Sequence, residues 1–148
     1  MKLNESKMMN LIIDIGNTRV KAAVFEKDRL IELLAFTREE TLGKIDFFLK
    51  KYQITDAILS SVQILSEKEV CDLQQKVSFI VLDAHTKVPF FNAYTTKDTL
   101  GVDRIASVSH ASKKYLNQNV LIIDAGTCIT YDYIKANKEY LGGAISPG

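Results

Sequence analysis

The sequence predicts an α/β protein with a mixed sheet, flanking helices and a core that occurs twice. Three strand-like segments follow one another between Asn10 and Phe36, and strand-like and helix-like segments then alternate as far as Leu82. Such alternation favours parallel pairing through right-handed crossovers, so the first and later strands are expected to share one sheet. In addition, an apolar run followed by Asp, Gly and Thr occurs twice, which indicates that the chain repeats its own site.

The first copy of this repeat spans Asn10 to Lys21 and reads NLIIDIGNTRVK. Residues 11–13 are too few for a helix and are typical of a strand buried on both faces. Asp14 and the turn at residues 16–18 follow, so N–H groups and a hydroxyl can meet a phosphate while the carboxylate holds hydrated Mg²⁺. A hairpin turn that binds no ligand uses the same residue types. This motif alone therefore does not decide between a phosphate site and an ordinary hairpin.

The second copy lies at residues 120–130 and reads VLIIDAGTCIT. Its apolar run, Asp124, Gly126 and Thr127 repeat the order of the first motif. Chance rarely duplicates such an order, and two facing turns of this kind would hold a polyphosphate from both sides. The repeat therefore favours the phosphate-binding interpretation.

The segments between the two motifs have clear periodicities. Thr37 with Glu40, and Ser66 with Glu69, have capping-box spacing before apolar residues at helical intervals. These patterns predict one helix from Thr37 to about Lys51 and a second from Ser66 through Val77. The other strands are expected at residues 19–26, 30–36, 57–60 and 79–82, the first two forming an antiparallel meander with the first motif.

Residues 83–99 are rich in aromatic side chains and have no clear period. They are either a substrate wall or a surface loop pinned by its aromatic residues. A helix is expected from Gly101 to about Asn117. At its start Asp103 is either a cap or an acid facing a cleft with Arg104 beside it, and periodicity does not decide between them.

After the second motif, strands are expected at residues 129–134 and 140–148. The ending LGGAISPG has turn signals of the kind found where a chain continues, so the sequence is interpreted as a truncated protein. No helix follows the second motif, which predicts that its part of the sheet lacks a covering layer.

The composition excludes several function classes. The chain has 148 residues and a net charge of +1, which gives no electrostatic footprint for nucleic acid or an anionic membrane. Residues 1–8 are expected to be a disordered lead, too polar for a signal peptide, and no apolar run is long enough to span a membrane. A cytoplasmic protein is therefore expected. Cys71 and Cys128 are expected to be buried thiols, and His85 and His110 to lie on the surface without a metal.

Four motifs in order, DIGNT at 14–18, GVDR at 101–104, DAGTCIT at 124–130 and GGAISPG at 142–148, make the sequence resemble the type III pantothenate kinases. It also resembles the wider superfamily of acetate and sugar kinases, Hsp70 and actin. The resemblance implies a ribonuclease H-like mixed sheet with flanking helices in a duplicated actin-like core. It divides the chain into an N-terminal lobe at residues 9–118 and the first strands of an incomplete second lobe at 119–148.

The resemblance also implies an activity. These kinases are transferases that move the γ-phosphoryl group of ATP to pantothenate, the first step of coenzyme A synthesis. They use Mg²⁺ and a monovalent cation, K⁺ or NH₄⁺, and are homodimers at full length. No nucleic acid or membrane partner is implied, and a fragment is expected to have little activity alone.

The site residues follow by position in the motifs. Asp103 would be the general base, and Asp14 and Asp124 would bind metal. Gly142 and Gly143 would allow close approach to the nucleotide. The implied ATP and phosphate ligands are Asp14, Gly16, Asn17, Thr18, Lys21, Gly126, Thr127 and Thr130. The implied pantothenate ligands are Tyr94, Gly101, Val102, Asp103 and Arg104.

Two departures from the family pattern and three alternatives accompany this assignment. The kinases of this family continue for roughly another domain after the PG, so this sequence is expected to lack most of the second lobe. Lys97 stands where the family commonly has a proline, so this loop is expected to be less rigid. A catalytically silent, nucleotide-binding accessory or regulatory protein would need the phosphate turns but no base, so Asp103 favours the enzyme. A sugar or acetate kinase would differ in its acceptor, and a phosphatase would place water beside Asp103.

Overall fold

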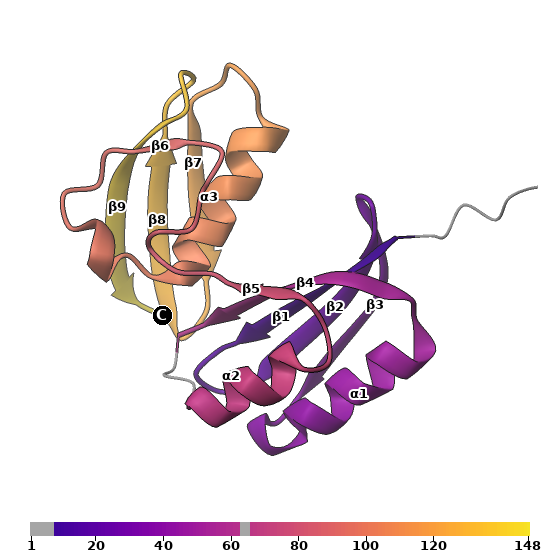
Figure 1. Cartoon of the computed structure of the whole chain (residues 1–148). Coiled ribbons are helices and arrows are strands. Elements are labelled where there is room, and N and C mark those ends of the chain that lie inside the picture. The colour runs from indigo at the N-terminus through magenta and orange to yellow at the C-terminus, as the bar shows by residue number, and fades with distance from the viewer. Residues whose placement is uncertain (1–7, 63–65) are drawn as a thin grey trace, which may run out of the picture. The chain divides into compact units, whose positions relative to one another are not determined.

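The computed structural model describes residues 8–62 and 66–148, so nearly all of the predicted lead lies outside the described residues. The chain divides into two compact units, one ending at Leu82 and the other spanning Asp83–Gly148 (Figure 1). This division precedes the predicted lobe boundary, because the helix at Val102–Lys114 belongs to the second unit. The boundary between residues 118 and 119 stays a prediction.

The first unit contains a five-stranded mixed sheet in the order β3-β2-β1-β4-β5. Strands β1, β2 and β3 form the predicted antiparallel meander. β4 pairs in parallel with β1, and β5 pairs in parallel with β4. The prediction of one mixed sheet is confirmed. The bounds are β1 Met9–Ile15, β2 Val20–Glu26, β3 Arg29–Phe36, β4 Ile54–Ser61 and β5 Phe79–Val81.

Helices α1 (Thr41–Lys51) and α2 (Glu67–Gln74) pack on one face of this sheet. Ile45 and Phe48 of α1 are fully buried among alternate residues of β1, β2 and β4, as period-two burial requires. The predicted capping box is present at a short 3-10 turn, η1 (Arg38–Glu40), where the Thr37 N–H donates to Glu40 Oε2 at 2.9 Å. The corresponding Glu69 side chain lies outside the described part.

The second unit has a four-stranded sheet in the order β6-β9-β8-β7 and one α-helix. The pairs β7·β8 and β8·β9 are antiparallel, and the short β6 lies parallel to β9. The aromatic segment 83–99 contributes β6 and a 3-10 turn, η2. The bounds are β6 Phe91–Asn92, η2 Lys97–Thr99, α3 Val102–Lys114, β7 Val120–Ala125, β8 Cys128–Ile134 and β9 Glu139–Pro147.

Two expectations need correction. The sheet of the second motif has a covering layer on one face, because α3, which precedes that motif, packs against β7 and β8. On the other face the side chains of Leu121, Ile123 and Tyr133 are exposed, as the sequence predicted for an uncovered sheet. The thiols of Cys71 and Cys128 are free but exposed, since one lies on the outer side of α2 and the other at the exposed start of β8. Among the described residues, the helices are all too short or too polar to cross a membrane.

Candidate phosphate-binding and acid–base site

The two repeated motifs place Asp and Gly at the same points of a strand end, and the turns that follow differ in length. In each, the Asp is the second-last residue of a strand and the Gly is the first residue after it. The Gly16 N–H donates to the Arg19 carbonyl at 3.1 Å, and the Gly126 N–H donates to the Cys128 carbonyl at 3.0 Å. The repeat found in the sequence thus corresponds to the same strand-end position of Asp and Gly in both units.

Cross-strand pairing gives each Asp a different neighbour. Asp14 of β1 lies opposite Lys21 of β2, whereas Asp124 of β7 lies opposite Thr130 of β8. The first motif therefore presents a carboxylate beside a cation, and the second a carboxylate beside a hydroxyl. Asn17, Thr18, Lys21, Asp124, Gly126 and Thr127 are exposed, and Asp14, Gly16 and Thr130 are half-buried.

The two motif strands also differ in position. β1 lies inside its sheet, between β2 and β4, whereas β7 is an edge strand of the described second sheet. The end of β9 lies against the second turn, because the Gly148 N–H donates to the Thr127 carbonyl at 3.3 Å. The DAGT and SPG segments, which the sequence analysis singled out separately, are therefore neighbours.

Asp103 lies in the first turn of α3 and is half-buried. Its Oδ1 accepts the Arg104 N–H at 2.9 Å. A side chain at Gly101 would crowd this carboxylate, since a Cβ at that position would lie 2.5 Å from Asp103 Oδ1. The glycine of the GVDR motif therefore makes room for the carboxylate, and Val102 beside it is half-buried.

Arg104 points into the second unit and is buried. Its Nη2 donates to Asp132 Oδ1 at 2.6 Å and to the Tyr140 hydroxyl at 3.2 Å. The Asp132 carboxylate raises the pKa of Arg104, and burial raises the pKa of Tyr140 well above its ordinary value. Asp132 and Tyr140 were not among the residues predicted from the sequence. An acid at an inward position of the strand ITYDYI is the signal that could have found the first.

Tyr94 completes this cluster within the second unit. The Arg104 guanidinium lies 5.8 Å from the centre of its ring, and the ring of Tyr140 lies 6.3 Å away. Gly142, with φ of +100°, leaves space for this ring, since a Cβ there would lie 2.5 Å from Tyr94 Cδ2. A Cβ at Gly143 would overlap the Tyr131 carbonyl. Both glycines therefore permit close packing of protein atoms, and their approach to a nucleotide stays a prediction.

The donors at the two motifs suit a hydrated Mg²⁺. Within residues 8–62 and 66–148 no three His, Cys, Asp or Glu side chains cluster to hold a metal. Mg²⁺ commonly binds through one or two carboxylates, waters and phosphates, so a single Asp at each motif fits it better than a cation that needs an all-protein site. Asp14 and Asp124 are the residues that would hold it.

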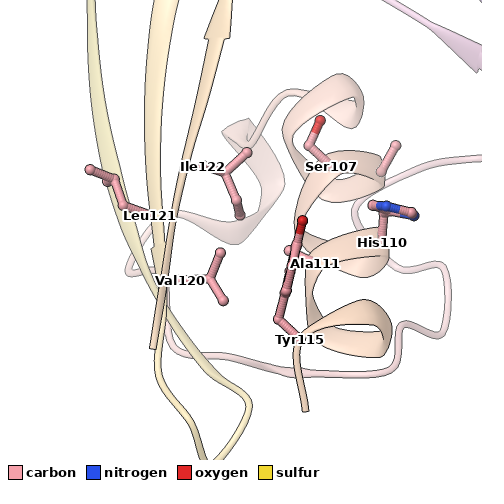
Figure 2. Close-up of a pocket in the computed structure, with 8 residues that line it drawn as sticks. Ser107, His110, Ala111, Tyr115, Val120, Leu121 and Ile122 are labelled. Atoms are coloured by element: carbon pink, nitrogen blue, oxygen red, sulfur yellow. The ribbon is translucent and has the colours of Figure 1, made fainter. Parts of the chain in front are cut away.

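A cavity of about 660 Å³ lies between α3 and β7, lined in part by residues 120–122, the apolar run of the second motif (Figure 2). Figure 2 shows Val120 and Ile122 pointing toward α3 and Leu121 pointing away from it. This lining is mostly apolar and shares no residue with the predicted site. Phosphate chemistry needs N–H groups, cations and carboxylates, so the motifs are a better candidate than this cavity.

The comparisons with known proteins match these observations. The family model of type III pantothenate kinase matches residues 10–148. A protein of Christiangramia forsetii named type III pantothenate kinase is 48% identical over 141 residues, which cover 95% of this chain and 58% of that protein. One of Flavobacterium johnsoniae with the same name is 40% identical over the same shares. The chain thus spans somewhat more than half the length of the curated relatives it matches.

Solved structures support the fold alone. The Lmo2764 protein from Listeria monocytogenes aligns with a TM-score of 0.52 and 16% identity, over 90% of this chain and 49% of that one. The type II variant of the Aquifex aeolicus Ppx/GppA phosphatase aligns with a TM-score of 0.50 and 13% identity, over 95% and 52%.

Proposed function

Because the chain belongs to the type III pantothenate kinase family, we propose that this protein transfers the γ-phosphoryl group of ATP to the primary hydroxyl of pantothenate. The product would be 4'-phosphopantothenate, the first intermediate of coenzyme A synthesis. The observation that supports this most is the repeated strand, Asp and Gly turn, since each such turn offers a carboxylate for Mg²⁺ beside polar groups for phosphate oxygens. The relatives are longer than this chain, and their names supply the substrate class.

Residues of the two motifs could bind the phosphates of ATP and neutralise their charge. The exposed residues at positions 17, 18 and 127 would bind phosphate oxygens through backbone N–H groups and hydroxyls, and Lys21 would neutralise charge. Mg²⁺, when bound, would offset the negative charge of the phosphates. Phosphoryl transfer depends mainly on positioning and charge neutralisation, so such groups account for most of the catalysis.

Asp103 would act on the acceptor. It would accept the hydroxyl proton of pantothenate while the hydroxyl oxygen forms a bond to the γ-phosphorus. The bond between the γ-phosphorus and the bridging oxygen breaks, and ADP leaves with the electron pair. Arg104 would serve this step by holding the first turn of α3, since its guanidinium is bonded to Asp132. We also propose that Arg104 or Tyr94 contacts pantothenate directly.

The test is a coupled assay for ADP release with Mg²⁺, K⁺ and pantothenate, on this chain and on a version extended past Gly148. We expect ADP release that depends on pantothenate in the extended form. Omitting K⁺ or replacing it by NH₄⁺ tests the monovalent cation, and sedimentation of the extended form tests the homodimer. If the extended form binds ATP but never turns over with pantothenate, the catalytically silent nucleotide-binding protein becomes the better assignment.

A further inference from the structure

Two buried side-chain oxygens in the described part of the chain lack a hydrogen-bond partner, Thr41 Oγ1 and Ser60 Oγ. Both residues are 8% exposed. Buried hydroxyls are nearly always hydrogen-bonded in native proteins, so each such orphan calls for a physical reason. For Ser60, its position in the sheet supplies one.

Ser60 lies at the end of β4, in register with Asp14 of the parallel strand β1. On the other side of Asp14 lies Lys21 of β2. Paired residues on neighbouring strands point to the same face of a sheet. Lys21, Asp14 and Ser60 therefore form a row of cation, carboxylate and hydroxyl on the face opposite the helices, next to the first Gly turn.

The end of β4 is also tied to that turn. The Val62 N–H donates to the carbonyl of Ile15 at 3.1 Å, and Ile15 directly precedes Gly16. Ser60 thus keeps a defined position beside the phosphate-type turn. Its hydroxyl can change direction by rotating between staggered χ1 positions without any movement of the backbone.

We propose that the Ser60 hydroxyl is a ligand group of the first phosphate site and hydrogen-bonds the Mg²⁺·phosphate complex held at Asp14. A serine hydroxyl both donates and accepts, so it can donate to a phosphate oxygen or accept from a metal-bound water. The partner that the protein itself does not provide would then come with the nucleotide. This inference rests on the proposed function, because it takes the anion at the first motif to be the phosphate chain of ATP.

The substitution Ser60→Ala tests this cleanly. It removes a hydroxyl that makes no hydrogen bond in the protein, so we expect the melting temperature to stay the same or rise. Thr41→Val is the matched control, since it removes the other orphaned hydroxyl of the same unit, which lies at the start of α1 away from the Asp14 row.

The affinity for ATP is measured by calorimetry with and without Mg²⁺, on the chain and on the version extended past Gly148. Ser60→Ala should weaken binding of Mg²⁺·ATP at least about tenfold, since a hydrogen bond to a charged group is lost. A loss only with Mg²⁺ identifies the metal-bound water as the partner, and a loss in both conditions identifies phosphate.

Equal affinities for Ser60→Ala, Thr41→Val and the unchanged protein would overturn the role of Ser60 and leave the proposed function intact. If the unchanged protein binds no ATP in either form, the proposed function fails and the inference fails with it.

Discussion

Arg104 at the start of α3 and Asp132 in the middle of β8 form a buried, two-point ion pair. The Arg104 Nε lies 3.0 and 3.1 Å from the two carboxylate oxygens, and its Nη2 lies 2.6 Å from Oδ1. The Tyr140 hydroxyl donates to the same Oδ1 at 2.5 Å. One carboxylate therefore joins α3, β8 and β9, and it fixes the helical turn that carries Asp103.

Asp132→Ala should strongly destabilise the protein. The substitution leaves the Arg104 guanidinium buried without its counter-ion, which typically costs about 3–5 kcal/mol. Urea unfolding measures this loss. Asp98→Ala is the control, because that side chain is 83% exposed and its removal should change the free energy of unfolding by less than about 0.5 kcal/mol. Similar small effects for both variants would contradict the buried pair.

Asp103→Asn should abolish phosphoryl transfer and leave ATP affinity within a few-fold. The amide cannot accept the acceptor's proton, whereas the two phosphate turns stay intact. The coupled assay and calorimetry on the extended form measure the two effects separately. A large loss of ATP affinity would contradict the role of Asp103 as a base.

Gly101→Ala should lower activity by displacing the Asp103 carboxylate, because the new Cβ would lie 2.5 Å from Oδ1. We expect a loss of at least about tenfold in kcat/KM, since small displacements of a catalytic group are costly. Gly43→Ala is the control. A Cβ at Gly43 in α1 meets nothing within 4 Å, so that variant should be fully active and more stable by about 0.5–1 kcal/mol. Full activity of Gly101→Ala would show that Asp103 tolerates the shift.

Glu40→Ala should destabilise the protein at neutral pH and have little effect in acid. The Thr37 N–H donates to the Glu40 carboxylate, which lowers the pKa of Glu40 below its ordinary value of 4.5. A lowered pKa means that the stabilisation is complete above the ordinary value and is lost as the pH falls through the pKa of the folded protein. The difference in urea midpoint between Glu40→Ala and the unchanged protein should therefore shrink below pH 4.5.

A difference that stays constant down to strongly acidic pH would show that the carboxylate charge is not what stabilises the cap. Lys44→Ala serves as the control. It removes the helical neighbour that lies 4.0 Å from Glu40 and leaves the bond to Thr37 in place.

Much of the fold could be predicted because its signals are local. The meander, the capping box at Thr37 and the helix ending at Lys51 depend on periodicity and on contacts between residues a few positions apart. The covering of the second sheet could not be predicted in this way. The helix that covers it precedes the motif, and only the packing of α3 against β7 and β8 shows to which sheet it belongs.

The residues of the candidate site likewise fall into those that a local sequence pattern predicts and those that tertiary contacts place. Residue types in a fixed order were enough to predict the two Asp and Gly turns, the acid at the start of α3 and the family to which the chain belongs. The pairing of Arg104 with Asp132 and the position of Ser60 beside Asp14 became visible in the folded chain alone. Such pairs join strands and helices far apart in the chain, so strand register and burial, which no local pattern encodes, determine them.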